Sequence, residues 1–188
     1  VGVTGTAVSP DGKNVTSLRN ICSLNIRVAR QVKGCSNEIF GRVFKGSVCG
    51  LLIAGPPASG KTTVLRDLIC RLSSFDGGPG LKTCVIDERG ELAAMKNGVC
   101  MNDVGTNSDV LTSYPKDSAI TMAVKTMSPQ IIACDEIATD AEVRAISRGA
   151  NSGVTFIATV HASSLGELIS RRQIEQLLDI GCFKNVAL

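Results

Sequence analysis

Short apolar runs recur along the chain from residue 48 onward, and each is followed by a polar loop or a helix-like stretch. A continuous apolar run is typical of a strand in a parallel sheet, because other elements cover both of its faces. The predicted strands are Leu51–Ala54, Thr83–Ile86, Ile131–Cys134 and Val154–Val160, with a last strand beginning within Phe183–Leu188.

The stretches between these runs carry apolar residues at helical spacing. The predicted helices run from near Lys61 through Leu72 and over Glu91–Met95, Ser118–Met127, Asp140–Ala150, Leu165–Arg171 and Ile174–Ile180. Asp76–Gly80 and the polar stretch Lys96–Pro115 are predicted loops. Strands that alternate with helices predict an α/β fold, in which helices cover both faces of a parallel β-sheet.

The first part of the chain shows a different pattern. Residues 1–20 alternate small, polar and apolar positions around Pro10–Lys13, a sequence typical of a turn, which predicts a β-hairpin. A helix is predicted over Leu24–Val32, because its apolar positions share one face, and Gly34 is a plausible stop.

These patterns predict two parts. Residues 1–46 are interpreted as a hairpin and helix that remain from an N-terminal domain or linker, and residues 47–188 as the α/β core. The chain begins at Val1 rather than at a methionine, so we expect an excised fragment that is also truncated at its C-terminus.

The composition is globular, with 44% hydrophobic and 20% charged residues in 188. A net charge of +3 and only 3% aromatic residues argue against a nucleic-acid partner, which would favour a dense basic face or stacking rings. No apolar run approaches the about 18 residues that a membrane-spanning helix needs. The eight cysteines lack the clustered spacing of a zinc site, so we expect reduced, buried thiols in a cytosolic protein.

A complete phosphate-binding motif, G-x-x-x-x-G-K-[ST], lies between a predicted strand and a predicted helix. It reads Gly55, Pro56, Pro57, Ala58, Ser59, Gly60, Lys61 and Thr62, and Thr63 is assigned to the same nucleotide site. Backbone N–H groups of such a loop curl around phosphate oxygens, and the helix N-terminus adds its dipole. Lys61 is expected to reach the β- and γ-phosphates of ATP, and the Thr62 hydroxyl to bind Mg²⁺. The alternative, a glycine-rich turn that happens to contain a lysine, does not explain this context.

Another predicted strand ends in Asp135 and Glu136. Carboxylates at the C-terminal ends of parallel strands face the crevice in which α/β sheets bind ligands. Asp135 is expected to bind Mg²⁺ directly or through water, and Glu136 to orient and polarise the attacking water. A solvated strand end is the alternative when such a pair is taken alone.

Two further strands end in candidate catalytic residues. Asp87 and Glu88 follow one strand, and Glu88 could position water or Mg²⁺, unless these acids only pair with Arg89. His161, the only histidine, ends the strand Val154–Val160, and a water-positioning or phosphate-sensing role is expected, although a lone histidine is often structural. Its strand should lie between the strand that precedes Gly55 and the strand that precedes Asp135.

In this order, the motifs resemble the ATPase core of the type II and type IV secretion family. That family has a P-loop, an acidic box, a Walker B strand with a glutamate, and a His box. The segment Gly153–Ser164 is similar to the His box, and Asp87-Glu88 takes the place of the acidic box. Ser23–Arg30, Val85–Arg89 and Asn102–Gly105 resemble a branch of the family that acts in sporulation.

The resemblance implies a RecA-like ATPase that works at a secretion-like channel of a spore-forming mother cell. Members are expected to form homo-oligomeric rings, such as hexamers, and to dock on a small membrane protein. The protein would therefore be cytoplasmic and peripheral at the membrane. Arg27 and Arg30, or Arg144 and Arg148, are the candidate pairs that would supply positive charge to a neighbouring subunit's nucleotide.

Other functions remain possible from the sequence. A P-loop kinase shares the phosphate-binding motif but needs an acceptor pocket and usually an arginine-rich lid, of which the sequence shows no sign. A nucleotide-dependent scaffold with vestigial hydrolysis is the other alternative. Asp135-Glu136 favours water activation, and therefore an ATPase that energises motion or assembly.

Overall fold

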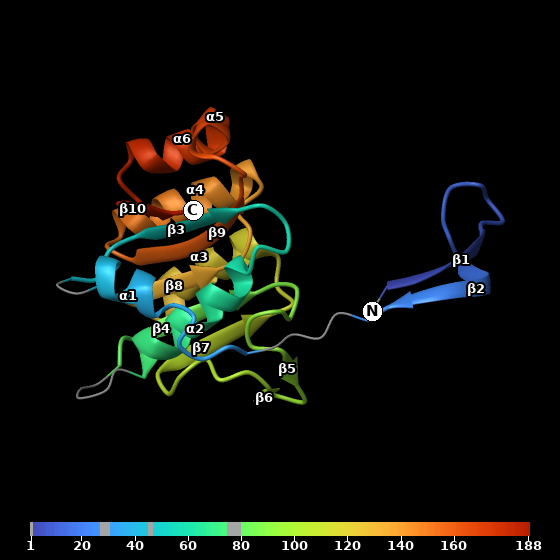
Figure 1. Cartoon of the computed structure of the whole chain (residues 1–188), viewed down its shortest axis with the longest axis horizontal. Helices are drawn as coiled ribbons and strands as arrows, with labels where there is room; N and C mark the ends of the chain where they lie inside the picture. Colours follow the sequence, from blue (N-terminus) through green and yellow to red (C-terminus); the bar gives the residue numbers. More distant parts are fainter. Residues whose placement is uncertain (1, 27–30, 45–46, 75–79) are drawn as a thin grey trace. The chain divides into compact units, whose positions relative to one another are not determined.

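The computed structural model describes residues 2–26, 31–44, 47–74 and 80–188. These residues form two compact units, one within residues 1–30 and the other within residues 31–188. Figure 1 shows the first unit as a two-stranded ribbon and the second as a layered α/β structure. Among the described residues, no helix has the length and the apolar character needed to cross a membrane.

The first unit is the predicted hairpin, in which β1 (Gly2–Val8) pairs antiparallel with β2 (Ser17–Asn25). In the turn, the Asp11 carboxylate accepts hydrogen bonds from the backbone N–H groups of residues 13 and 14 at 3.0 and 2.9 Å. The predicted helix Leu24–Val32 is wrong at its start, because Leu24 pairs with Val3 as part of β2. Residues 31 and 32 are not helical either, and residues 27–30, with Arg27 and Arg30, lie outside the described residues.

The second unit contains a parallel sheet of six strands in the order β10-β3-β9-β8-β4-β7. This arrangement confirms the predicted α/β class. The strands are β3 (Leu51–Gly55), β4 (Thr83–Asp87), β7 (Ser108–Thr112), β8 (Ile131–Cys134), β9 (Thr155–His161) and β10 (Asn185–Ala187).

Helices cover both faces of the sheet (Figure 1). They are α1 (Asn37–Val43), α2 (Lys61–Ser73), α3 (Lys116–Thr126), α4 (Asp140–Asn151), α5 (Leu165–Ser170) and α6 (Arg172–Asp179). Side chains alternate along β3, so that Leu51 and Ile53 pack with α2 in one core while Leu52 and Ala54 pack in the other with α3, α4 and α6. Sequence periodicity predicted α2 to α6, but not α1.

Helix α1 packs on α2 and belongs to the second compact unit. The Asp67 carboxylate of α2 accepts hydrogen bonds from the backbone N–H groups of Gly34 and Ser36, both at 2.9 Å. The Arg71 guanidinium lies over the Phe40 ring, 4.1 Å from its centroid. The segment that precedes the sheet is thus fixed to the helix that follows the P-loop, whereas the assignment of residues 1–46 to an N-terminal domain or linker stays a prediction.

The connection between β4 and α3 differs from its prediction. Residues 91–93 form a bend rather than a helix, because the buried Asp87 carboxylate accepts the backbone N–H groups of Glu91, Leu92 and Ala93 at 2.8–3.0 Å. A small hairpin of β5 (Met95–Lys96) and β6 (Val99–Cys100) follows. The polar stretch then supplies β7, an edge strand whose partly exposed side chains hide the apolar signal.

The cysteines are free thiols. Burial raises the pKa of Cys84, Cys134 and Cys182 to about 12, so these thiols stay protonated at neutral pH and pack as small apolar groups. Cys22 and Cys35 are exposed, so the expectation of buried thiols is wrong for these two.

Candidate functional site

The phosphate-binding motif forms the loop between β3 and α2, as its sequence predicted. Ala58 and Gly60 have φ values of 60° and 92°, in the left-handed region that lets the loop turn tightly. The Ser59 N–H closes a turn to the Pro56 carbonyl at 3.3 Å. A Cβ atom at Gly55 would lie 2.6 Å from the Ser59 hydroxyl, so a side chain there would force the Ser59 side chain to move. The exposed loop therefore ends directly at the N-terminus of α2.

Lys61 is the first residue of α2, and it is 8% exposed. Its ammonium donates to the carbonyl oxygens of Gly55 at 2.9 Å and Pro56 at 2.7 Å, and lies 3.2 Å from His161 Nδ1. Burial lowers the pKa of Lys61, while the nearby Asp135 and Glu136 carboxylates oppose that shift. The Lys61 ammonium therefore lies against the loop, at the start of α2.

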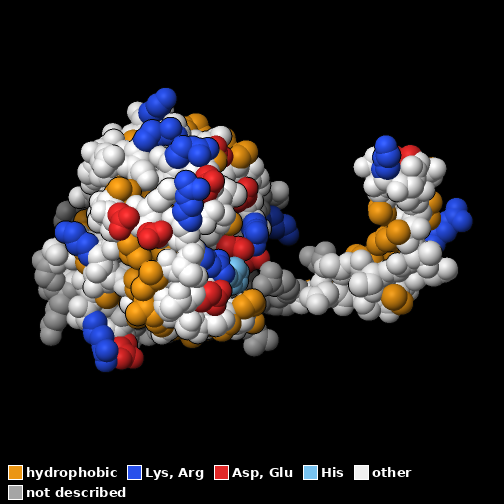
Figure 2. Space-filling view, turned by 90° about the horizontal axis from the view of Figure 1, so that it is seen from above, with side chains coloured by type: hydrophobic (Ala, Val, Ile, Leu, Met, Phe, Trp, Pro, Cys, Tyr) orange, Lys and Arg blue, Asp and Glu red, His pale blue; other side chains and the backbone are white. Residues whose placement is uncertain are grey.

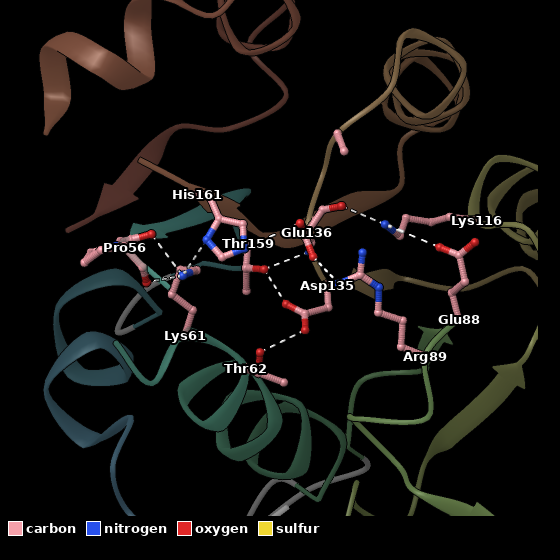
Figure 3. Close-up of polar contacts among 12 residues, drawn as sticks. Pro56, Lys61, Thr62, Glu88, Arg89, Lys116, Asp135, Glu136, Thr159 and His161 are labelled. Carbon is pink, nitrogen blue, oxygen red and sulfur yellow. Dashed lines mark hydrogen bonds and ion pairs between the residues drawn. The ribbon is translucent and has the colours of Figure 1, made fainter. Parts of the chain in front are cut away.

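Thr62 and Asp135, the two predicted metal ligands, are in direct contact. The Thr62 hydroxyl donates to Asp135 Oδ2 at 2.8 Å. The Thr159 hydroxyl of β9 donates to the other oxygen, Oδ1, and accepts the Glu136 N–H at 2.8 Å. Thr159, 1% exposed, therefore fixes both acidic residues at the end of β8 (Figure 3).

Glu136 lies between two cationic or titratable groups (Figure 3). Its Oε1 atom is 3.4 Å from His161 Nε2, and its Oε2 atom is 2.5 Å from Arg89 Nη1. The side chains of Glu136 and His161 are 28% and 37% exposed, and Figure 2 shows the histidine at the surface among acidic and basic side chains. Glu136 is therefore accessible from solvent while its carboxylate is oriented from two sides.

The sheet order explains this proximity. Strand β9 lies between β3 and β8, as predicted for His161, and the parallel register pairs Gly55 with His161. The C-terminal ends of the three strands thus present the P-loop, His161 and Asp135-Glu136 along one edge of the sheet (Figure 3). This confirms their predicted clustering, while their catalytic, nucleotide-binding and metal-binding roles stay predictions.

The second pair of acids is divided between different environments. Asp87 is 2% exposed, and its carboxylate oxygens accept hydrogen bonds from the backbone N–H groups of residues 91–93. Its role is therefore to stabilise the loop. Glu88 is more exposed, and its Oε2 atom lies 3.8 Å from Lys116 Nζ. Both line a small pocket with Arg89, Lys116 and the end of β8. Glu88 therefore remains the residue of this pair that can face a ligand.

Sequence reasoning missed Thr159 and Lys116, and it considered Arg89 only in the alternative that Asp87 or Glu88 pairs with it. Arg89 pairs with Glu136, which is distant in sequence, rather than with its neighbours Asp87 and Glu88. Thr159 is a polar residue inside an apolar run, which was a usable signal. Lys116 offered another, because a cation at a helix N-terminus opposes the helix dipole.

The residues present fit a magnesium ion that is bound together with phosphate. Among the described residues, no cluster of three histidine, cysteine or acidic side chains could hold a metal alone. Mg²⁺ characteristically takes one or two protein oxygens and completes its shell with phosphates and water. The Thr62 hydroxyl and the Asp135 carboxylate supply hard oxygen donors next to the P-loop.

Comparisons with known proteins agree with this architecture. Stage III sporulation protein AA of Bacillus subtilis (strain 168) is 36% identical over 185 residues, which cover 97% of this chain and 60% of that protein. Protein SEEDLING PLASTID DEVELOPMENT 1 of Arabidopsis thaliana is 27% identical over 180 residues, covering 93% of this chain and 25% of that protein. The chain therefore spans less than two thirds of the length of each of these relatives.

The pilus retraction motor PilT, in a crystal structure with bound ADP, has a similar fold. Its TM-score is 0.54 at 16% identity, over 88% of this chain and 49% of PilT. This likeness confirms the predicted RecA-like fold. The family described as "Sporulation stage III, protein AA" matches residues 1–188. The chain belongs to this sporulation family.

Proposed function

We propose that this chain binds ATP with Mg²⁺ and hydrolyses ATP. The observation that carries the proposal is the contact between Thr62 and Asp135 at 2.8 Å, directly beside Lys61, Glu136 and His161. Mg²⁺-dependent phosphoryl transfer in P-loop proteins requires a P-loop hydroxyl and a strand-end carboxylate that lie next to each other.

The binding part of the proposal rests on the loop and on α2. The backbone N–H groups of the exposed loop and of the first turn of α2 would donate hydrogen bonds to phosphate oxygens, aided by the helix dipole. Lys61 would exchange its carbonyl partners, Gly55 and Pro56, for phosphate oxygens. PilT, which shares the fold, is described with bound ADP, and this supports a nucleotide as the ligand.

The hydrolytic part rests on Glu136 and His161. Mg²⁺ would supply charge neutralisation at the phosphates. Glu136 would orient water and take its proton, and the His161 ring, 3.4 Å away, would align the carboxylate. Glu88 would act as a second acid at the rim of the same pocket. A kinase would instead shield its phosphates from water with a lid, and the sequence shows no arginine-rich segment of that kind.

In the cell, we propose that hydrolysis energises a secretion-like channel or its assembly during sporulation, as the family suggests. The protein would act as a homo-oligomeric ring, such as a hexamer, on the cytoplasmic side of the mother-cell membrane, bound to a small membrane protein. Arg144 and Arg148 are exposed on α4 and line a groove with α6, so they are available to a partner. Arg27 and Arg30 remain the rival pair for the contact in trans.

The test compares the wild-type chain with Lys61→Ala and with Lys125→Ala, an exposed lysine on α3. Calorimetry should show that ATP binding requires Lys61 but not Lys125. Phosphate release should likewise be lost in Lys61→Ala and retained in Lys125→Ala. Equal ATP affinity in the Lys61 variant would refute the P-loop assignment. Binding without phosphate release, even at concentrations that allow assembly, would favour a scaffold, and transfer to an acceptor would favour a kinase.

A further inference from the structure

Lys116 is a buried lysine at an unfavourable place. It is the first residue of α3, after Pro115, and it is 7% exposed. A helix N-terminus carries partial positive charge, which repels a cation. Removing an ammonium from water is also costly unless it is paired and hydrogen-bonded. A lysine at this position therefore needs several partners to offset its burial.

Its partners come from three segments that surround the site (Figure 3). The ammonium donates to the backbone carbonyl of Glu136 at 2.7 Å and to Glu142 Oε1 at 3.3 Å. Glu88 Oε2 lies 3.8 Å away. Lys116 therefore joins the end of β4, the turn after β8 and the start of α4 through a single side chain.

The backbone of Glu136 shows why this contact matters. Its φ value of 51° lies in the left-handed region, which is unfavourable for a residue with a side chain. Such a conformation persists only when the surroundings fix it. Here the Glu136 N–H is bound by the Thr159 hydroxyl at 2.8 Å, and its carbonyl by Lys116. The two bonds together direct the Glu136 side chain toward His161.

Glu142 strengthens the same junction. Its Oε2 atom accepts the N–H groups of Ala138 and Thr139 at 2.7 and 3.1 Å, as part of the capping box of α4. Its Oε1 atom faces Lys116, and both side chains are nearly buried, at 9% and 8% exposed. The ion pair thus fixes the first turn of α4 to the turn that contains Glu136.

We propose that Lys116 is a positioning residue for hydrolysis, which keeps the strained turn at Glu136 in its productive conformation and couples it to Glu88. The inference rests on the proposed ATPase function. Lys116 does not take part in phosphate binding, because its ammonium is committed to groups on the far side of Glu136 from Lys61. Loss of Lys116 should therefore affect turnover and leave nucleotide binding nearly intact.

The experiment compares Lys116→Met and Lys116→Arg with Lys125→Met, which removes an exposed lysine from the last turn of the same helix. In Lys116→Met, kcat should fall by about 10- to 100-fold, the scale of a catalytic group displaced by about an ångström. The ATP dissociation constant should change by less than about 3-fold, because Lys116 would make no contact with the bound nucleotide and its loss would affect only the catalytic step. Lys116→Arg should recover part of kcat because it keeps the charge, and Lys125→Met should match the wild type.

Thermal unfolding of each variant separates positioning from loss of fold. If Lys116→Met is unfolded, the double variant Lys116→Met/Glu142→Gln replaces it, because it removes both buried charges together. The folded variant should still show the loss in kcat. The inference would be overturned if the kcat of Lys116→Met equalled that of Lys125→Met. It would also be overturned if ATP affinity fell by as large a factor as kcat.

Amide hydrogen exchange tests the same idea without turnover. Exchange in a peptide that covers residues 135–138 should become faster in Lys116→Met than in Lys125→Met, because the turn loses one of its anchors. Unchanged exchange would overturn the positioning role even if the wild type proves to be an ATPase. Conversely, faster exchange in a chain whose phosphate release never exceeds that of Lys61→Ala would show that Lys116 anchors the turn at Glu136, but it would refute the proposed hydrolysis.

Discussion

Thr159 offers a sensitive test of the site, because its hydroxyl serves two partners inside a buried strand. It donates to the Asp135 carboxylate and accepts the Glu136 N–H at 2.8 Å, and the residue is 1% exposed. Thr159→Val keeps the shape of the side chain but replaces the hydroxyl by a methyl group. The Glu136 N–H would then lack its acceptor, and Asp135 would lose a donor.

The magnitude follows from these contacts. Loss of a hydrogen bond to a charged group costs about 1.5–3 kcal/mol, and a buried N–H without a partner costs about 1–3 kcal/mol. Thr159→Val should therefore lower the free energy of unfolding by about 3 kcal/mol. Thr159→Ser keeps the hydroxyl and loses one methyl group, which should cost about 1 kcal/mol.

Urea unfolding followed by circular dichroism measures the loss of stability in both variants, and thermal unfolding measures the corresponding change in Tm. In a chain of this size, about 3 kcal/mol corresponds to a fall in Tm of about 6–12 °C, against about 2–4 °C for the serine variant. Phosphate release should fall in Thr159→Val and be largely retained in Thr159→Ser. If the valine variant were as stable as the serine variant, the hydroxyl would not be anchoring Asp135 and Glu136.

Three other changes have clear expected results. Glu136→Gln should still bind ATP, measured by calorimetry, while phosphate release falls by about 100-fold or more, and normal turnover would point to Glu88 instead. Burial raises the pKa of Asp67, but hydrogen bonds from Ser36 and Gly34 lower it by more, so its net pKa lies below the usual value. Its contribution to stability is therefore present above pH about 4 and lost as pH falls through the folded-state pKa, and acid titration of Asp67→Asn should show a shallower loss. Gly50→Ala should destabilise the junction of β3 and β10 by about 1–3 kcal/mol in urea, because its Cβ would lie 1.9 Å from the Cys182 carbonyl oxygen, and an unchanged midpoint would contradict this geometry.

Several parts of this protein could be predicted from the sequence because their signals are local. The apolar run that ends at Gly55, followed by Lys61 and Thr62, is a complete motif in its proper strand–helix context. Strands buried on both faces are continuous apolar runs, so β3, β4, β8 and β9 were found within a residue of their observed ends. The carboxylates at those ends, with His161, were then expected to meet.

Errors arose where a tertiary contact outweighed the local pattern. Residues 91–93 bend instead of forming a helix, because Asp87 binds their N–H groups. Leu24 joins a strand because Val3 pairs with it. The edge strand β7 carries only a weak apolar signal, since part of it faces solvent. Helix α1 lacks a strong periodicity, and its packing on α2 stabilises it.

The detailed site was decided by the tertiary structure. The sequence predicted that Asp135 and Glu136 lie at a strand end. The sheet order placed β9 next to β8, so that the Thr159 hydroxyl forms hydrogen bonds with both residues. Arg89 and Lys116 reach Glu136 across 47 and 20 positions of sequence. Such contacts depend on which strands are neighbours, and a local pattern carries no information on that. The motif therefore determined which reaction the candidate site is suited to, and the packing of the sheet determined which side chains position Asp135 and Glu136.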